Sequence, residues 1–194
     1  MIDLPSDIFQ CGHFRYESGD HGDVWLNLDR LFVDARRMRG WALTLADVLS
    51  PTTPQVIVGA LTGGAFLANV LAAEMGVAFV FSQRVVLEGG EVRYRIPDTL
   101  RETLHGKTCL LVDDAINAGS ALRGTLADVL TCGGRIVGIG SLIVMGEAAE
   151  RIAAEQGVPF QALARVERQM WRAEHCPLCA NGVPLTPSAA TSPQ

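Results

Sequence analysis

Two adjacent carboxylates, Asp113 and Asp114, follow an apolar run that begins at Thr108. A turn of small residues, 115–119, comes directly after them and leads into a segment with a helical pattern. Backbone N–H groups at a helix start have no partner within the helix, and the positive end of the helix dipole lies there. Such a turn can hold a phosphate, and the neighbouring acids can accept hydrogen bonds from sugar hydroxyls. The segment therefore predicts a binding site for a phosphorylated sugar.

The segments around this motif predict an α/β fold. The apolar patterns predict buried strands at 56–59, 77–81, 108–112, 135–144 and 158–163, and helices at 35–49, 65–75, 120–130 and 148–155. Alternation of strand and helix predicts a doubly wound, mainly parallel sheet, in which ligands bind at the carboxyl ends of the strands. Two hairpins are predicted as well, one within 9–33 and one over 85–96 with a two-residue turn at Gly89-Gly90.

Three segments fall at this edge of the predicted sheet: the loop that contains Thr62, Gly63 and Gly64, the segment that begins with Arg84, and the turn after Asp114. Glycine at positions 63 and 64 would let the backbone approach a diphosphate closely. Asp before a Gly-containing turn is common in doubly wound folds. A two-component receiver domain also has an Asp pair, but on its first strand, whereas more than a hundred residues precede the pair here.

Composition and length restrict the function classes. With 194 residues, 48% of them hydrophobic, the chain is expected to form one domain over residues 1–183. Residues 184–194 have the composition of a disordered tail. A net charge of −5 argues against nucleic acid as a partner. The start of the chain does not resemble a secretory signal, and glycines and polar residues interrupt the apolar span 56–82, so we expect a cytoplasmic protein without a membrane partner.

A family resemblance rests on three stretches. Residues 111–121, Leu-Val-Asp-Asp-Ala-Ile-Asn-Ala-Gly-Ser-Ala, resemble the phosphoribosyl pyrophosphate (PRPP) signature of type I phosphoribosyltransferases, in the version found in orotate phosphoribosyltransferases. Residues 12–27 are similar to the base-binding hood of that subfamily, and residues 58–64 are similar to its diphosphate loop. The implied fold is the type I phosphoribosyltransferase fold, with a small hood formed mainly by residues 9–33 and a lid over 85–105.

The resemblance implies transfer of ribose 5-phosphate from PRPP to a nucleobase, most closely orotate, with release of pyrophosphate. It implies Mg²⁺ held by PRPP without protein ligands, and a homodimer. Asp113, Asp114 and Arg84 would be the catalytic residues, and Phe14 and Trp25 would bind the base. The implied PRPP-binding set is Thr62, Gly63, Gly64, Arg84, Asp113, Asp114, Ala115, Asn117, Ala118, Gly119, Ser120 and Ala121.

The sequence departs from the orotate pattern in four places. The lid lacks the family's Lys and His, and only Arg93 and Arg95 could substitute for them. Glu17 stands where many relatives have Lys, Met145-Gly146 replaces Asp-Arg, and Asn117 replaces Thr in the phosphate loop. Two alternatives therefore stay open: transfer to another base, and a non-catalytic regulator that senses PRPP or a nucleotide.

A second motif lies near the C-terminus. Cys176 and Cys179 form a Cys-x-x-Cys pair with Gly182 three residues further on, which is typical of half a zinc site. His175 could add a third ligand, and Cys11 with His13, or the same pair from a second subunit, would have to complete the set. The alternative is a capped turn with ordinary thiols. The odd total of five cysteines favours free thiols or metal ligands over disulfides.

Overall fold

The computed structural model of the chain describes residues 2, 4–16 and 19–187. Within these residues the chain divides into two compact units. The large unit contains residues 2 and 32–166, and the small unit contains residues 4–31 and 167–187. No described helix has both the length and the apolar character needed to cross a membrane.

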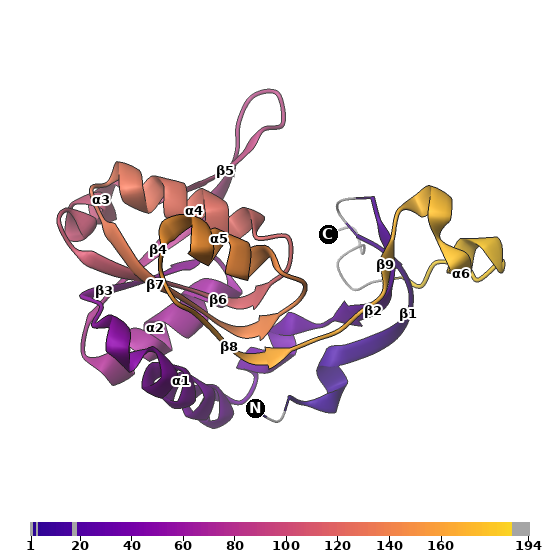
Figure 1. The fold of residues 1–194 in the computed structure, drawn as a ribbon, viewed down its shortest axis with the longest axis horizontal. Coiled ribbons are helices and arrows are strands. Elements are labelled where there is room, and N and C mark those ends of the chain that lie inside the picture. Colours follow the sequence, from indigo (N-terminus) through magenta and orange to yellow (C-terminus); the bar gives the residue numbers. More distant parts are fainter. Residues whose placement is uncertain (1, 3, 17–18, 188–194) are drawn as a thin grey trace. The chain divides into compact units, whose positions relative to one another are not determined.

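A six-stranded sheet forms the centre of the large unit, with the strand order β5-β4-β3-β6-β7-β8 (Figure 1). Neighbouring strands pair in parallel, except that β5 is antiparallel to β4. The strands are β3 (Val56–Ala60), β4 (Ala78–Val86), β5 (Val92–Arg95), β6 (Thr108–Ile116), β7 (Arg135–Val144) and β8 (Phe160–Arg165).

Helices cover both faces of this sheet (Figure 1). On one face lie α1 (Ala35–Leu49) and α2 (Gly63–Met75), and on the other lie α4 (Ser120–Thr131) and α5 (Ala148–Gln156). A short helix, α3 (Asp98–Arg101), lies between β5 and β6 in the chain. The prediction of an α/β fold with a mainly parallel sheet is confirmed.

The predicted boundaries of α1 agree with the structure, and its start shows why. The Asp34 side chain accepts hydrogen bonds from the backbone N–H groups of Arg36 and Arg37, at 3.0 and 3.1 Å. This cap satisfies two of the first N–H groups, which have no partner inside the helix. Met38, Trp41 and Leu45 then recur at helical spacing and are buried, which fixes one face of α1 in the core.

Strand β6 is longer than predicted. The apolar run ends at Val112, but pairing with β7 continues from Asp113 opposite Ser141 to Ile116 opposite Val144. Backbone hydrogen bonds to β7 hold the two acids in an extended conformation, although aspartate is a poor strand former. The Asp pair therefore lies within the last part of a strand rather than after it.

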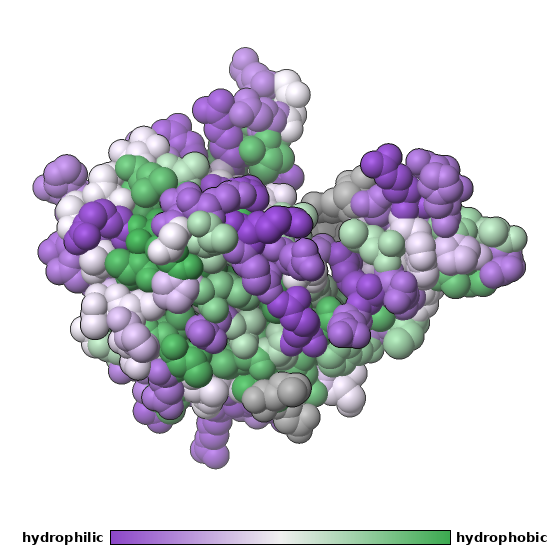
Figure 2. Space-filling model, in the orientation of Figure 1, coloured by the Kyte–Doolittle hydropathy of each residue, from purple (hydrophilic) through white to green (hydrophobic). Residues whose placement is uncertain are grey.

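Strands β4 and β5 form the second predicted hairpin, with Val86 paired to Val92. The reversal differs from the prediction, because Leu87 N donates to Glu91 O at 2.8 Å and three residues, 88–90, lie between them instead of two. Gly89 and Gly90 have φ of 94° and 85°, a region that glycine adopts without strain. Figure 2 shows hydrophilic residues over the projecting tip of this hairpin.

The small unit contains a three-stranded antiparallel sheet with the order β1-β2-β9. Its elements are β1 (Phe9–Arg15), β2 (His21–Leu26), β9 (Met170–Trp171) and the four-residue helix α6 (Pro177–Ala180). β1 and β2 form the predicted N-terminal hairpin, whereas β9 and α6 were not predicted.

The first residues of the predicted tail are hydrogen-bonded to β1. The backbone N–H of Thr186 donates to the carbonyl of His13 at 2.6 Å, and Thr186 Oγ1 accepts from the His13 N–H at 3.1 Å. Residues 188–194 of that tail lie outside the described residues, and so does Glu17.

Candidate functional site

The carboxylates of Asp113 and Asp114 lie against the backbone of Gly63 and Gly64. These glycines begin α2, separated by two residues from the end of β3, and β3 is the parallel neighbour of β6. A Cβ atom on Gly63 would overlap the Asp114 carboxylate, and a Cβ atom on Gly64 would overlap the Asp113 carboxylate. Only glycine permits this approach. The structure therefore brings together the two loops that the sequence assigned separately to a sugar and a diphosphate.

The surroundings of Asp113 disfavour a negative charge on its side chain. Burial, together with the adjacent Asp114 carboxylate, raises the pKa of Asp113 well above its usual range, because both disfavour a negative charge. A hydrogen bond from the Asp114 backbone N–H to Asp113 Oδ1, at 3.2 Å, acts in the opposite direction. A ligand that brings hydroxyl donors or a cation to this pair would relieve the repulsion.

We expect Asp113→Asn to raise the thermal stability of the ligand-free protein at neutral pH. Because the pKa of Asp113 is raised by folding, the folded chain holds this proton at pH values where the unfolded chain, with a pKa near 3.8, has lost it. Stability therefore falls as pH rises above about 4. Asparagine removes this titration, so the gain in Tm should grow from pH 4 toward pH 7 and disappear at lower pH.

Thermal unfolding of the variant and the parent over this pH range measures the effect. Asp47→Asn is the control for the change from a carboxylate to an amide, because Asp47 is exposed on α1 and lies outside the Asp pair. An Asp113→Asn variant that is less stable than the parent at every pH would contradict a raised pKa of Asp113 in the folded chain.

A cavity of about 220 Å³ lies at the start of α4. It is lined by Asp113 and residues 115–122. Gly119, with φ of 77°, turns the chain into the helix, and the N–H groups of the first helical turn follow it. Ser120 and Ala121 thus contribute backbone donors at the positive end of a helix dipole, beside Asp113. The arrangement suits a phosphate group.

Arg84 is exposed on β4, opposite Tyr94 of β5. Tyr94 lies over Gly124 of α4, where a Cβ atom would come within 2.7 Å of its ring. Side chains alternate along a strand, so Arg93 and Arg95 stand on the other face of the hairpin. Arg93 is paired with Glu91 at 2.8 Å. The hairpin therefore carries guanidinium groups on both faces.

Phe14 and Trp25, the two predicted base-binding residues, are packed together in the small unit. Their ring centroids are 6.0 Å apart, and Phe14 is fully buried. Tyr16 stacks on Trp25 at 6.3 Å with an interplanar angle of 14°, and the Arg168 guanidinium lies 4.4 Å from the centre of the Tyr16 ring. Phe14 therefore supports Trp25 and has no exposed face of its own on which a base could stack. Trp25 is only half-buried.

Met145 and Gly146 follow β7, at the same edge of the sheet as the Asp pair. Met145 is buried, and the carbonyl of Gly146 accepts a hydrogen bond from Arg165 Nη1 at 2.8 Å. Arg165 also forms an ion pair with Glu150. Strand β8, the neighbour of β7, thus places the Arg165 guanidinium at the end of β7, where the family pattern has Arg.

The Cys-x-x-Cys pair lies in the small unit together with two histidines. His13, His21, Cys176 and Cys179 place their ligand atoms within 4.8 Å of one another. His21 was not predicted, whereas Cys11 and His175 are exposed and lie outside this group of four. All five cysteines are free thiols.

Comparison with known proteins identifies the family. The family described as "Phosphoribosyl transferase domain" matches residues 34–169. The orotate phosphoribosyltransferase of Caldanaerobacter subterraneus subsp. tengcongensis is 26% identical over 179 residues, which cover 92% of this chain and 89% of that protein.

Solved structures share the fold. An adenine phosphoribosyltransferase from Rhodothermus marinus superposes with a TM-score of 0.65 at 18% identity, covering 82% of this chain and 95% of the other. The Mycobacterium tuberculosis orotate phosphoribosyltransferase in complex with PRPP has a TM-score of 0.58 at 18% identity, with coverage of 73% and 80%. The predicted type I fold is confirmed, and at this identity the structures do not distinguish between acceptor bases.

Proposed function

Because the chain belongs to the phosphoribosyl transferase domain family, we propose that it transfers ribose 5-phosphate from PRPP to orotate. The products are orotidine monophosphate and pyrophosphate, as in pyrimidine biosynthesis. One observation carries the proposal: the Gly63-Gly64 backbone lies against the Asp113 and Asp114 carboxylates, beside the cavity at the start of α4. The relatives named orotate phosphoribosyltransferase support the choice of acceptor.

The 5-phosphate of PRPP would occupy the cavity at the start of α4, held by the backbone of residues 115–121. The ribose hydroxyls would donate to Asp113 and Asp114, and the diphosphate would lie along Thr62, Gly63 and Gly64 with Arg84 as its cation. The bond from the anomeric carbon to the pyrophosphate oxygen then breaks, a bond to a ring nitrogen of the base forms, and that nitrogen loses its proton.

Positive charge develops on the ribose in such a reaction. The two carboxylates are fixed before the substrate arrives, so they can stabilise that charge without reorganising. This role requires no protein nucleophile.

Magnesium would be held by the diphosphate oxygens of PRPP, and we assign it no protein ligand. The residues fit this assignment, because burial and the adjacent Asp114 carboxylate raise the pKa of Asp113, and a hard cation nearby would favour the charged form of these oxygens. When bound, the ion supplies neutralising charge to the leaving pyrophosphate. The homodimer and the cytoplasmic location stay predictions.

The β4–β5 hairpin is proposed to supply the cations that the family's lid provides through Lys and His. We expect Arg93→Ala and Arg95→Ala each to lower the rate of pyrophosphate release by about 10- to 100-fold, since a charge-assisted hydrogen bond contributes about 1.5–3 kcal/mol. Arg135→Ala is the matched control, because Arg135 is exposed at the amino end of β7, at the opposite edge of the sheet. Unchanged rates in both hairpin variants would eliminate this role.

Another acceptor base is the second candidate. Met145-Gly146 replaces the Asp-Arg of the orotate pattern, and Arg165, which donates to the Gly146 carbonyl, is already paired with Glu150. We propose that the acceptor stacks on Trp25, whatever its identity, because Phe14 and Tyr16 hold that ring in place.

Calorimetric titration with PRPP and Mg²⁺, followed by a pyrophosphate-release assay with a panel of bases, tests the proposal. Binding together with turnover on orotate would support it. Turnover on a different base would keep the reaction and replace the acceptor. Binding without turnover on any base would instead identify a sensor of PRPP, and the absence of PRPP binding would refute both the enzyme and the sensor.

A further inference from the structure

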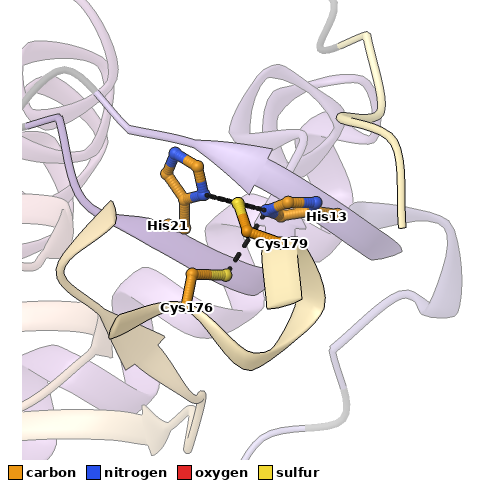
Figure 3. Close-up of side chains that lie close together, drawn as sticks. All are labelled: His13, His21, Cys176 and Cys179. Atoms are coloured by element: carbon orange, nitrogen blue, oxygen red, sulfur yellow. Dashed lines mark hydrogen bonds between the residues drawn. The ribbon is translucent and has the colours of Figure 1, made fainter. Parts of the chain in front are cut away.

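Four side chains of the small unit converge on one point (Figure 3). His13 lies on β1 and His21 on β2, while Cys176 and Cys179 flank the start of α6. His13 Nε2 is 2.9 Å from His21 Nδ1, 3.5 Å from Cys176 Sγ and 3.6 Å from Cys179 Sγ. Cys179 Sγ is 3.2 Å from His21 Nδ1.

These separations are close to those of a tetrahedral zinc site. Bonds of about 2.0–2.1 Å to nitrogen and about 2.3 Å to sulfur place neighbouring ligand atoms roughly 3.3–3.8 Å apart. Four of the six separations run from 2.9 to 3.6 Å and all six lie within 4.8 Å, so an ion would enter after side-chain shifts of up to about 1 Å. Two thiols and two imidazoles are also a ligand set that structural zinc sites commonly use.

A hydrogen bond outside the cluster orients one of the imidazoles. His13 Nδ1 lies 2.7 Å from the carbonyl of Val183, an acceptor, so Nδ1 carries the proton and Nε2 turns its lone pair toward the cluster. Metal-binding histidines commonly donate their second ring N–H in this way. Backbone hydrogen bonds from Gly182 to Cys179 and from Val183 to Leu178 hold the turn that supplies this carbonyl.

The surroundings exclude water from most of the cluster. His13, His21 and Cys176 are 1%, 7% and 3% exposed, while Cys179 is exposed. The small unit has little else to hold it together, because its buried apolar side chains among the described residues are Ile8, Phe14, Leu31 and Cys176. Units with so small a core usually rely on disulfides or a metal, and the cysteines here are free thiols.

We propose that His13, His21, Cys176 and Cys179 bind one structural Zn²⁺ ion within a single chain. The ion links the N-terminal hairpin to the C-terminal segment, which lie more than 150 residues apart in sequence. It has four protein ligands and no open position, so it stabilises the small unit and takes no part in chemistry. The proposal stands independently of the proposed transferase activity.

Elemental analysis of the full chain, purified without chelator, is the first test. We expect about one zinc per chain, the number that four ligands can hold. Replacement of the zinc by Co²⁺ should give the absorption bands of a tetrahedral thiolate site. Zinc well below stoichiometry, together with no thiolate bands on addition of Co²⁺, would overturn the proposal.

Variants then identify the ligands. Cys176→Ser, Cys179→Ser and His21→Ala should each lose most of the zinc and lower the Tm, whereas His21→Cys should retain zinc, because three cysteines and one histidine also form a zinc site. Cys11→Ser and Cys132→Ser are matched controls outside the cluster and should keep full zinc content. Full zinc content in Cys176→Ser and Cys179→Ser would show that the metal binds elsewhere, and would equally overturn the proposal.

Discussion

Replacing either Asp113 or Asp114 with asparagine is expected to lower kcat/KM for PRPP by about 10²–10³-fold, the range found when one preorganised electrostatic group is removed from an active site. Asparagine keeps the size of each side chain but cannot carry the negative charge that bound Mg²⁺ and the positive charge developing on the ribose would favour in the proposed reaction. Steady-state pyrophosphate release at varied PRPP concentration measures the loss. The effect should appear mainly in kcat if the charge acts on the transition state, and in KM if it only anchors the hydroxyls.

Asp47→Asn serves as the control for these variants, because Asp47 is exposed on α1 and its replacement should leave kcat/KM unchanged. The Asp113→Asn variant carries a second signature, since it should gain stability at neutral pH while it loses activity. Asn variants that fold and still turn over within about threefold of the parent rate would contradict the role of the pair in transition-state stabilisation.

Adding one methyl group at Gly63 or Gly64 is expected to lower kcat/KM at least about 100-fold, because a displacement of about 1 Å in an active site can have that effect. In Gly63→Ala the new Cβ would overlap the Asp114 carboxylate, and in Gly64→Ala it would overlap the Asp113 carboxylate. The carboxylates or the loop must then move apart. Pyrophosphate release and PRPP titration measure the consequence for turnover and for binding.

Gly40→Ala is the matched control. Gly40 lies within α1, and apart from its chain neighbours and the nearby backbone of its own helix, a Cβ atom there would meet nothing within 4 Å. This substitution should leave activity intact and raise stability slightly, because alanine is the better helix former. Unaltered kinetics in Gly63→Ala and Gly64→Ala would mean that the close approach of the two loops has no part in the reaction.

The fold of the large unit was largely predictable from local patterns. The cap at Asp34 and the helical spacing of Met38, Trp41 and Leu45 set the boundaries of α1. The length of β6 was not predictable in this way. Its last residues are held by pairing with Ser141, Ile143 and Val144 of β7, a tertiary contact that the intrinsic preferences of the acids do not reveal.

The cluster of His and Cys residues shows a different limit of sequence reasoning. The spacing of Cys176 and Cys179 is a local signal, but His21 is a single histidine on a short strand more than 150 residues away. Cys11 was named with His13 as one way to complete the ligand set, and alternate residues of a regular strand share a face. The register of β1 shifts between Cys11 and Phe14, which breaks that alternation and leaves Cys11 exposed.

The acceptor base is the least determined part of the site from sequence. The residues that would hold PRPP follow the carboxyl ends of parallel strands. Because β3 and β6 are neighbours in the sheet, the Asp pair lies against the Gly63-Gly64 loop. The base contacts depend on single side chains at positions where this chain departs from the orotate pattern, such as Met145-Gly146. Burial of Phe14 is likewise a packing outcome that the spacing of aromatic residues did not indicate.

Incubation of the full chain with PRPP, Mg²⁺ and orotate, with orotidine monophosphate and pyrophosphate quantified in the same sample, tests the central claim most directly. We predict that the two products form in equal amounts, and that neither forms in the Asp113→Asn, Asp114→Asn double variant at more than a small fraction of the parent rate. No orotidine monophosphate from a chain that calorimetry shows to bind PRPP would contradict the claim that this site transfers ribose 5-phosphate to orotate.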